Sequence, residues 1–180
     1  MPARRCLRSQ LARRWSGLAE SALGGTQAEW LLLAMGQVFV SASTGTAVYV
    51  FADDHCPPHV HARHRGDGWV ARVRFSYVAS AVERISIAPL KNPPLRRVLN
   101  QLLGDIHTRL SDCRRSWWAT RRTTCLENRW AVTPASGTIL LCPGTTPGAK
   151  QIADGGYDPA AERLKVTFRD GTIAEVSTQP

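Results

Sequence analysis

Two runs of alternating side chains on either side of a glycine-containing turn constrain the fold most strongly. His59–His64 and Trp69–Val78 flank the turn Arg65–Gly68, and this spacing is typical of a β-hairpin. Symmetrical pairing about the turn gives these expected partners: His59 with Arg74, Val60 with Val73, His61 with Arg72, Ala62 with Ala71, and Arg63 with Val70. Because alternate residues of a strand point to opposite faces, the small apolar side chains share one face and the polar ones share the other. The pattern therefore predicts a core-facing side and a solvent-facing side.

More strands are expected around this hairpin. Gln37–Ala42 and Thr46–Ala52 are rich in Val, Phe and Tyr and are separated by a Ser-Thr-Gly turn. Ala81–Leu90 is a further strand candidate. Together these segments predict a small antiparallel sheet between Met35 and Leu90.

One long helix is expected after the sheet. Pro93 and Pro94 suit the first turn of a helix. Apolar residues then recur at steps of three and four: Leu95, Val98, Leu99, Leu102, Ile106, Leu110, Cys113 and Trp117. This stripe predicts an amphipathic helix that covers the apolar face of the sheet, although Gly104 weakens its middle.

The C-terminal part is expected to be rich in β-structure. Cys125–Val132 and Gly137–Cys142 have strand-like composition, and Arg163–Phe168 and Thr172–Val176 flank an Asp-Gly turn that predicts a second hairpin. The predicted fold class is therefore α+β: a small antiparallel sheet packed by one long amphipathic helix, with a β-rich C-terminal extension.

Four segments are expected along the chain. Residues 1–34 are a basic leader, expected to be poorly ordered or to form short helices, and residues 35–142 form the α+β domain. Residues 143–150 are expected to be a linker, and residues 151–180 a C-terminal hairpin tail. Met35 is the only methionine after Met1, so one hypothesis is that the native product begins there.

The chain is strongly basic, with a formal net charge of +9 and 20 Arg against 3 Lys. Residues 47–150 carry 15 basic and seven acidic groups. Such a balance suits a polyanionic partner such as RNA, or an acidic protein. An arginine-rich composition on an ordinary solvated surface stays open as the alternative.

The cysteines and the apolar runs favour a cytoplasmic protein. The five cysteines make an odd count without a C-x-x-C pair, which argues against a disulfide scaffold and fits a reducing compartment. Trp30–Val40 is the only long apolar run, and eleven residues are too few to cross a bilayer. No membrane association is expected.

Four of the five histidines lie within Asp53–His64. A metal site is one interpretation, with these candidate ligands: Asp54, His55, His59 and His61. Against it, the expected pairing places Arg72 and Arg74 beside the same imidazoles, where guanidinium groups repel a divalent cation.

Phosphate chemistry is the leading interpretation of the same residues. Two imidazoles could serve as general base and general acid in RNA cleavage, while two guanidinium groups stabilise the developing charge. The candidate catalytic residues are His59, His61, Arg72 and Arg74, and the candidate anion-binding residues are His55, Arg63 and Arg65. Structural interpretations stay open as well: His55 could cap the turn, and His64 could pack on Trp69.

The stretch from Val48 to about Trp118 resembles DUF-4160, a bacterial family of unknown function. The resemblance rests on the motif D-H-x-P-P-H-x-H, present here as Asp54, His55, Pro57, Pro58, His59 and His61, followed by the hairpin and the helix. It implies a compact domain and a place in two-gene toxin–antitoxin modules, without an established activity. Tyr157 and Leu164–Gly171 are similar to a frequent neighbour of that family, DUF-2442.

The leading hypothesis is a cytoplasmic toxin–antitoxin-like component that binds or cleaves RNA through the face of His59, His61, Arg72 and Arg74. If it is an enzyme, a metal-independent ribonuclease is expected, and no cofactor. The competing hypotheses are a non-enzymatic module that docks an acidic, antitoxin-like protein partner, and a histidine-based metal-binding domain.

Overall fold

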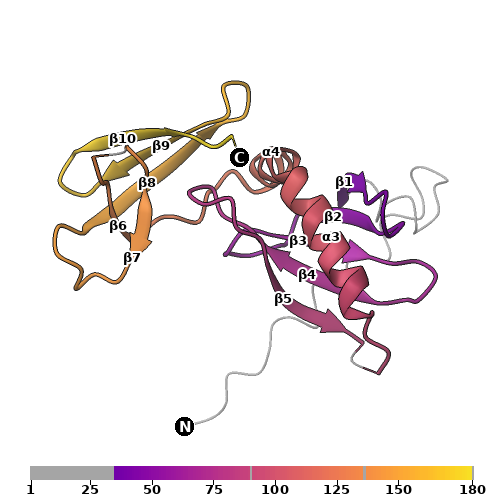
Figure 1. Ribbon diagram of the computed structural model, residues 1–180. Helices are drawn as coiled ribbons and strands as arrows, with labels where there is room; N and C mark the ends of the chain where they lie inside the picture. Colours follow the sequence, from indigo (N-terminus) through magenta and orange to yellow (C-terminus); the bar gives the residue numbers. More distant parts are fainter. Residues whose placement is uncertain (1–34, 90, 136, 180) are drawn as a thin grey trace, which may run out of the picture. The chain divides into compact units, whose positions relative to one another are not determined.

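The computed structural model describes residues 35–89, 91–135 and 137–179, so the expected leader at residues 1–34 lies outside the described residues. Within these ranges ten strands form two antiparallel sheets of five strands, and two helices lie between the sheets in the sequence (Figure 1). The first sheet follows chain order: β1 (Met35–Val40), β2 (Ala47–Phe51), β3 (His59–Arg63), β4 (Val70–Arg74) and β5 (Glu83–Ala88). The α+β class is confirmed, although the fold is mostly β.

The predicted register of the central hairpin is confirmed at each of its five pairs. His59 lies opposite Arg74 and His61 opposite Arg72 in β3 and β4. Val60 and its partner Val73 are buried, as the alternation predicts. The hairpin also pairs with β2 on one side and β5 on the other, which completes the predicted sheet.

The prediction of one long helix is wrong. The stripe is divided between α3 (Arg96–Thr108) and α4 (Leu110–Arg121), which run in different directions (Figure 1). They meet at Arg109, with φ −105° and ψ 25°. The hydroxyl of Thr108 donates to the carbonyl of Gly104 at 3.0 Å, and such back-bonding bends helices. The apolar stripe continues across the bend.

The core of this part of the chain lies between the first sheet and the two helices. Leu102 and Ile106 of α3 and Trp117 of α4 are fully buried, together with Val60 and Ala62 of the sheet. Burying one large apolar side chain contributes about 1.5–3 kcal/mol. Leu95, by contrast, is 75% exposed because the helix begins only at Arg96. Neither of the described helices is long and apolar enough to cross a membrane.

The second sheet has the order β10-β9-β8-β6-β7 (Figure 1). Its strands are β6 (Trp130–Val132), β7 (Leu140–Cys142), β8 (Lys150–Asp158), β9 (Arg163–Phe168) and β10 (Ile173–Ser177). The segment expected to be a linker, residues 143–150, connects β7 to β8 within this one sheet. It therefore does not separate residues 35–142 from residues 151–180. The reason is that β6 pairs with β8 as well as with β7.

The long strand β8 was not expected, because its sequence contains Asp and a Gly-Gly pair. Gly155 is required by close approach: a Cβ there would lie 2.4 Å from the hydroxyl oxygen of Thr124. That hydroxyl donates to the Gly155 carbonyl at 3.0 Å. The predicted C-terminal hairpin is confirmed, with Leu164 opposite Val176 and Val166 opposite Ala174.

Arg114 is a buried charge, although it lies outside the predicted apolar stripe. Its guanidinium donates to the carbonyl oxygens of Ser76, Ala79 and Thr178. Burial lowers the pKa of Arg114. The carbonyl oxygens satisfy its donors, so this one side chain connects α4 to the loop after β4 and to the C-terminal segment.

The described residues contain one disulfide, which the odd cysteine count did not indicate. Cys56 and Cys125 form a disulfide, while Cys113 and Cys142 are free thiols and Cys6 lies outside the described residues. Spacing along the sequence could not reveal this pair. Disulfides persist mainly in oxidising compartments, so the cysteine count no longer supports the expected cytoplasmic location, which stays a prediction.

Candidate metal centre

Asp54 is held in the loop between β2 and β3 by its own backbone turn. Its carboxylate Oδ2 accepts the backbone N–H of Phe51 at 2.8 Å, and its N–H donates to the Phe51 carbonyl at 3.2 Å. This local closure is typical of Asp after a strand. The side chain is 7% exposed, and the turn leaves Oδ1 available to other partners.

Two imidazoles of β3 meet this one carboxylate oxygen. Nε2 of His61 lies 2.8 Å from Oδ1 of Asp54, and Nε2 of His59 lies 3.2 Å from the same atom. His59 and His61 are two residues apart on a strand, so both point to the same side. The cluster thus combines two nitrogen ligands and one oxygen ligand, all within 4.8 Å of one another.

The other ring nitrogen of His59 fixes which atom faces Asp54. Nδ1 lies 2.9 Å from the carbonyl oxygen of Pro57. A carbonyl can only accept, so Nδ1 carries the proton, and in a neutral ring Nε2 then has only a lone pair. That lone pair would face a carboxylate oxygen. The pair is favourable only if a proton or another cation lies between Nε2 and Oδ1.

The carboxylate of Asp54 stays ionised in this environment. Burial alone would raise the pKa of Asp54, but hydrogen bonds with His59 and His61 and from the Phe51 N–H outweigh burial and hold the pKa well below its ordinary value. An ionised carboxylate beside two imidazoles is the usual state of such residues in a metal site.

Aromatic contacts hold both imidazoles in place. The His59 ring lies 5.5 Å from the Trp117 ring of α4 and is 1% exposed as a residue. The rings of His61 and Phe51 are nearly perpendicular, with 4.5 Å between their centroids, and the His61 side chain is 18% exposed. The cluster is therefore closed on the His59 side and partly accessible on the His61 side.

The ligand separations suit one small ion. Zinc binds imidazole nitrogen and carboxylate oxygen at about 2.0–2.2 Å, so two ligands of a tetrahedral ion lie roughly 3.4 Å apart. The separation of 3.2 Å between Oδ1 of Asp54 and Nε2 of His59 is near that value, whereas Nε2 of His61, at 2.8 Å, lies at an ordinary hydrogen-bond distance. His59 also has the arrangement of a metal-bound imidazole, because its second nitrogen donates to a backbone carbonyl.

The structure separates the other candidate residues from this cluster. His55 is exposed, with its ring 5.9 Å from that of His59, and it is not among the three clustered ligands. His64 stacks on Trp69 at 5.3 Å and accepts the N–H of Asp67, so its packing role is confirmed.

The expected open face of two histidines and two arginines is not formed. His59 is buried, whereas Arg74 is half-exposed and forms an ion pair with Glu83. Arg72, opposite His61, is partly buried, and its Nε has no hydrogen-bond partner. Arg63 and Arg65 are exposed. The four catalytic candidates therefore share neither one environment nor common access to solvent, because the loop and α4 cover His59.

Two members of the site could not be recognised by motif spacing. The Pro57 carbonyl acts through its backbone, and Trp117 lies 58 positions after His59 in the sequence. A comparison with protein-family models, curated proteins and solved structures found no match. The resemblance to DUF-4160 therefore stays a prediction.

Proposed function

We propose that this protein binds a divalent transition-metal ion through Asp54, His59 and His61. The observation that carries the proposal is that Nε2 of His59 and Nε2 of His61 both lie beside one oxygen of the buried Asp54 carboxylate, while Nδ1 of His59 is fixed on the Pro57 carbonyl. A metal ion at this position would be bound by both Nε2 atoms and by the Asp54 carboxylate, in place of the protons that these groups otherwise share.

The ligand set favours zinc or a neighbouring first-row metal. Imidazole nitrogen suits Zn²⁺, Fe²⁺, Ni²⁺ and Cu²⁺, whereas Mg²⁺ and Ca²⁺ prefer oxygen alone. Three protein ligands leave at least one coordination position for water or substrate, as in catalytic rather than structural zinc sites. The partial exposure of His61 is consistent with access from that side.

Arg72 is the main physical argument against a cation. Its strand position is directly opposite His61, and two positive charges at such a distance repel each other. The ionised Asp54 compensates one charge at the centre. An anionic group bound to the metal would compensate the other, and the unpaired Nε of Arg72 favours such a ligand.

The test is a calorimetric titration of the chelator-treated full chain with Zn²⁺, together with Co²⁺ absorption spectra that report the ligand geometry. We expect one equivalent to bind. At a free ion concentration of 100 times Kd, the free energy of unfolding should rise by about 2.7 kcal/mol. Asp54→Asn and His61→Ala should each weaken binding at least about 100-fold.

His55→Ala is the matched control, because His55 neighbours the cluster but is not one of its ligands. It should bind Zn²⁺ like the wild type. His61 is preferred over the buried His59 as the main variant, since its partial exposure makes a folding defect less severe. The proposal fails if the wild type binds no stoichiometric ion, or if His55→Ala and His61→Ala weaken binding equally.

RNA binding is a second candidate, carried by a different observation. Several exposed arginines have no ion-pair partner within the described ranges: Arg63, Arg65, Arg84, Arg96 and Arg97. Arg97 lines a cavity together with His64 and Asp67, which flank Arg65 at the hairpin turn, so Arg65 and Arg97 lie in the same region. Uncompensated guanidinium groups favour phosphate.

A salt titration of RNA binding tests this candidate. Affinity should fall linearly on a log–log plot, and Arg65→Gln/Arg97→Gln should reduce the slope by roughly 0.7 for each phosphate of single-stranded RNA that is no longer neutralised. Arg163→Gln, on β9, should leave the slope unchanged.

The toxin hypothesis is tested by induced expression in a bacterial host. The wild-type protein should arrest growth, and the variant His59→Ala/His61→Ala should not. Normal growth with both proteins contradicts the hypothesis.

A further inference from the structure

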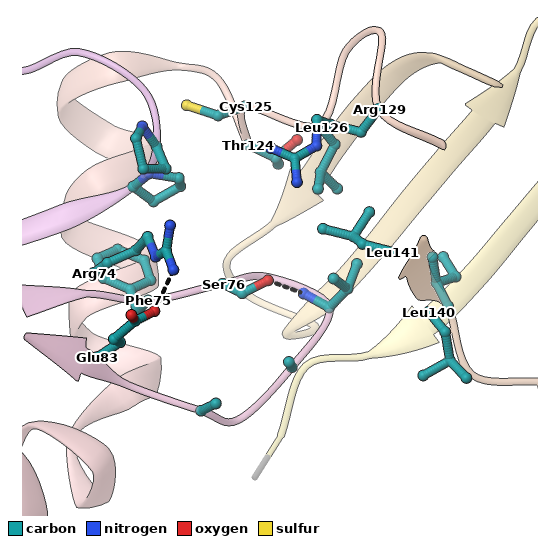
Figure 2. A pocket seen from close by; sticks show the side chains of 16 residues that line it. Arg74, Phe75, Ser76, Glu83, Thr124, Cys125, Leu126, Arg129, Leu140 and Leu141 are labelled. Atoms are coloured by element: carbon teal, nitrogen blue, oxygen red, sulfur yellow. Dashed lines mark hydrogen bonds and ion pairs between the residues drawn. The ribbon is translucent and has the colours of Figure 1, made fainter. Parts of the chain in front are cut away.

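A cavity of about 420 Å³ lies next to the Asp54–His59–His61 cluster, and Pro57 belongs to both. Its walls come from the β2–β3 loop, the end of β4 with the loop after it, and the segments around Leu126 and Leu141 (Figure 2). Asp54, His59 and His61 do not line it. This volume is within the range of small-molecule sites, about 300–1,000 Å³.

Most of the lining is apolar. Phe75 and Leu126 are buried and Leu141 is half-buried in its walls (Figure 2). Ile139 is a further buried residue of the lining. Apolar walls of this kind favour a ligand with a hydrophobic body. Water alone fills such a space less favourably than an apolar group does.

The charged groups on the lining differ in how they are compensated. Arg74 forms an ion pair with Glu83, which cancels both charges (Figure 2). Arg129 has no hydrogen-bond or ion-pair partner for its side chain among the described residues. The lining therefore carries one net positive charge, and it belongs to Arg129.

Two backbone hydrogen bonds fix the position of Arg129 in the chain, and therefore the point from which its charged side chain extends. Its N–H donates to the Leu126 carbonyl at 3.0 Å, and its carbonyl accepts the Ile152 N–H at 2.8 Å. Ser76 adds a second polar group: its hydroxyl oxygen accepts the Val78 N–H at 3.1 Å, and its proton has no acceptor within the described ranges.

We propose that this cavity binds a small organic monoanion with an apolar body, such as a medium-chain or aromatic carboxylate, whose charged group pairs with Arg129. Arg129 is exposed at the edge of the cavity, so a purely apolar ligand would gain nothing from its charge, whereas an anionic group forms a charge-assisted hydrogen bond with it. A dianion would carry more charge than the lining compensates. The proposal does not depend on the metal site.

Two fluorescent dyes test the proposal. Anilinonaphthalene sulfonate carries one negative charge on an aromatic body, and N-phenylnaphthylamine is its uncharged analogue. The full-length wild type should bind one equivalent of the anionic dye, and octanoate should displace it. Arg129→Gln should weaken the anionic dye about tenfold or more, because a charge-assisted hydrogen bond is removed, and leave the neutral dye within twofold.

Two further variants complete the design. Leu141→Asn should weaken both dyes, because it makes the apolar wall polar. Arg163→Gln removes an exposed arginine of β9 outside the cavity and should change neither affinity. Circular dichroism and thermal unfolding establish that each variant is folded. Equal affinity of Arg129→Gln and Arg163→Gln for the anionic dye overturns the proposal, and so does the absence of saturable binding to the wild type.

Discussion

Cys56 and Cys125 lie 69 positions apart in the chain, and their disulfide connects the loop that holds Asp54 to the segment after α4. The connection continues through noncovalent contacts. Trp117 donates its indole N–H to the Thr123 carbonyl at 2.9 Å, and its ring packs against His59. The Asp54–His59–His61 cluster is therefore held on one side through the disulfide and on the other through Trp117.

Removing this cross-link should weaken metal binding and lower stability. In the double variant Cys56→Ser/Cys125→Ser, the loop around Asp54 loses its attachment, and the free energy of unfolding should fall by about 2–4 kcal/mol. Zn²⁺ affinity should fall about tenfold, measured by calorimetry. Serine replaces cysteine because free thiols could bind zinc themselves. Cys142→Ser should leave the affinity unchanged; an unaltered affinity in the double variant contradicts the coupling.

Replacing Arg114 should destabilise the protein severely. Arg114→Lys retains the charge but cannot reach the carbonyls of Ser76, Ala79 and Thr178 with a single ammonium group. Its buried partners are left without donors, so we expect a loss of about 2–4 kcal/mol in urea unfolding. The neighbouring Arg115→Lys affects only exposed ion pairs and should cost less than about 1 kcal/mol. Similar losses in the free energy of unfolding of both variants would contradict this role of Arg114.

The carboxylate of Asp105 should make the free energy of unfolding depend on pH in the acid range. Partial burial raises the pKa of Asp105, but hydrogen bonds from Ser41 and Ser43 outweigh burial and hold it below its ordinary value. Its contribution is therefore complete above about pH 4 and is lost as the pH falls through the lowered pKa. Asp105→Asn should cost about 1 kcal/mol at pH 7 and progressively less in acid. Parallel unfolding profiles from pH 7 to pH 2 would contradict this, and Asp53→Asn is the control.

Cys113 should be unreactive in the folded protein. Burial raises the pKa of its thiol to about 12, so almost none of the reactive thiolate exists at pH 8. Peptide mapping after treatment with iodoacetamide should find Cys142 modified first and Cys113 modified only in denaturant. Rapid native modification of Cys113 would mean that α4 opens readily.

Features governed by local periodicity could be predicted from the sequence. The hairpin register followed from alternation around a glycine-containing turn, because a shift by one residue would exchange Val60 and Ala62 for polar side chains such as His61 and Arg63 on the face that packs in the core. The C-terminal hairpin followed in the same way from its Asp-Gly turn. In both, the turn and the apolar alternation specify the same pairing.

Features set by distant partners could not be predicted. The helix bends where the Thr108 side chain bonds to its own backbone, which the apolar stripe does not reveal. Asp54, His59 and His61 were all candidate site residues in the sequence. That His59 is buried could not be predicted, because the burial depends on Trp117, which belongs to α4. Strand β8 contains glycine because Thr124 approaches it, and strand propensity carries no information about that approach.

The interior position of β6 in the second sheet determines where this chain can be shortened. A protein ending at residue 142 would retain β6 and β7 but lose β8, the partner of Trp130 and Ala131. The newly bare backbone edge would then be available to neighbouring molecules, and such edges promote aggregation. Laboratory fragments of this protein should therefore retain the whole C-terminal segment.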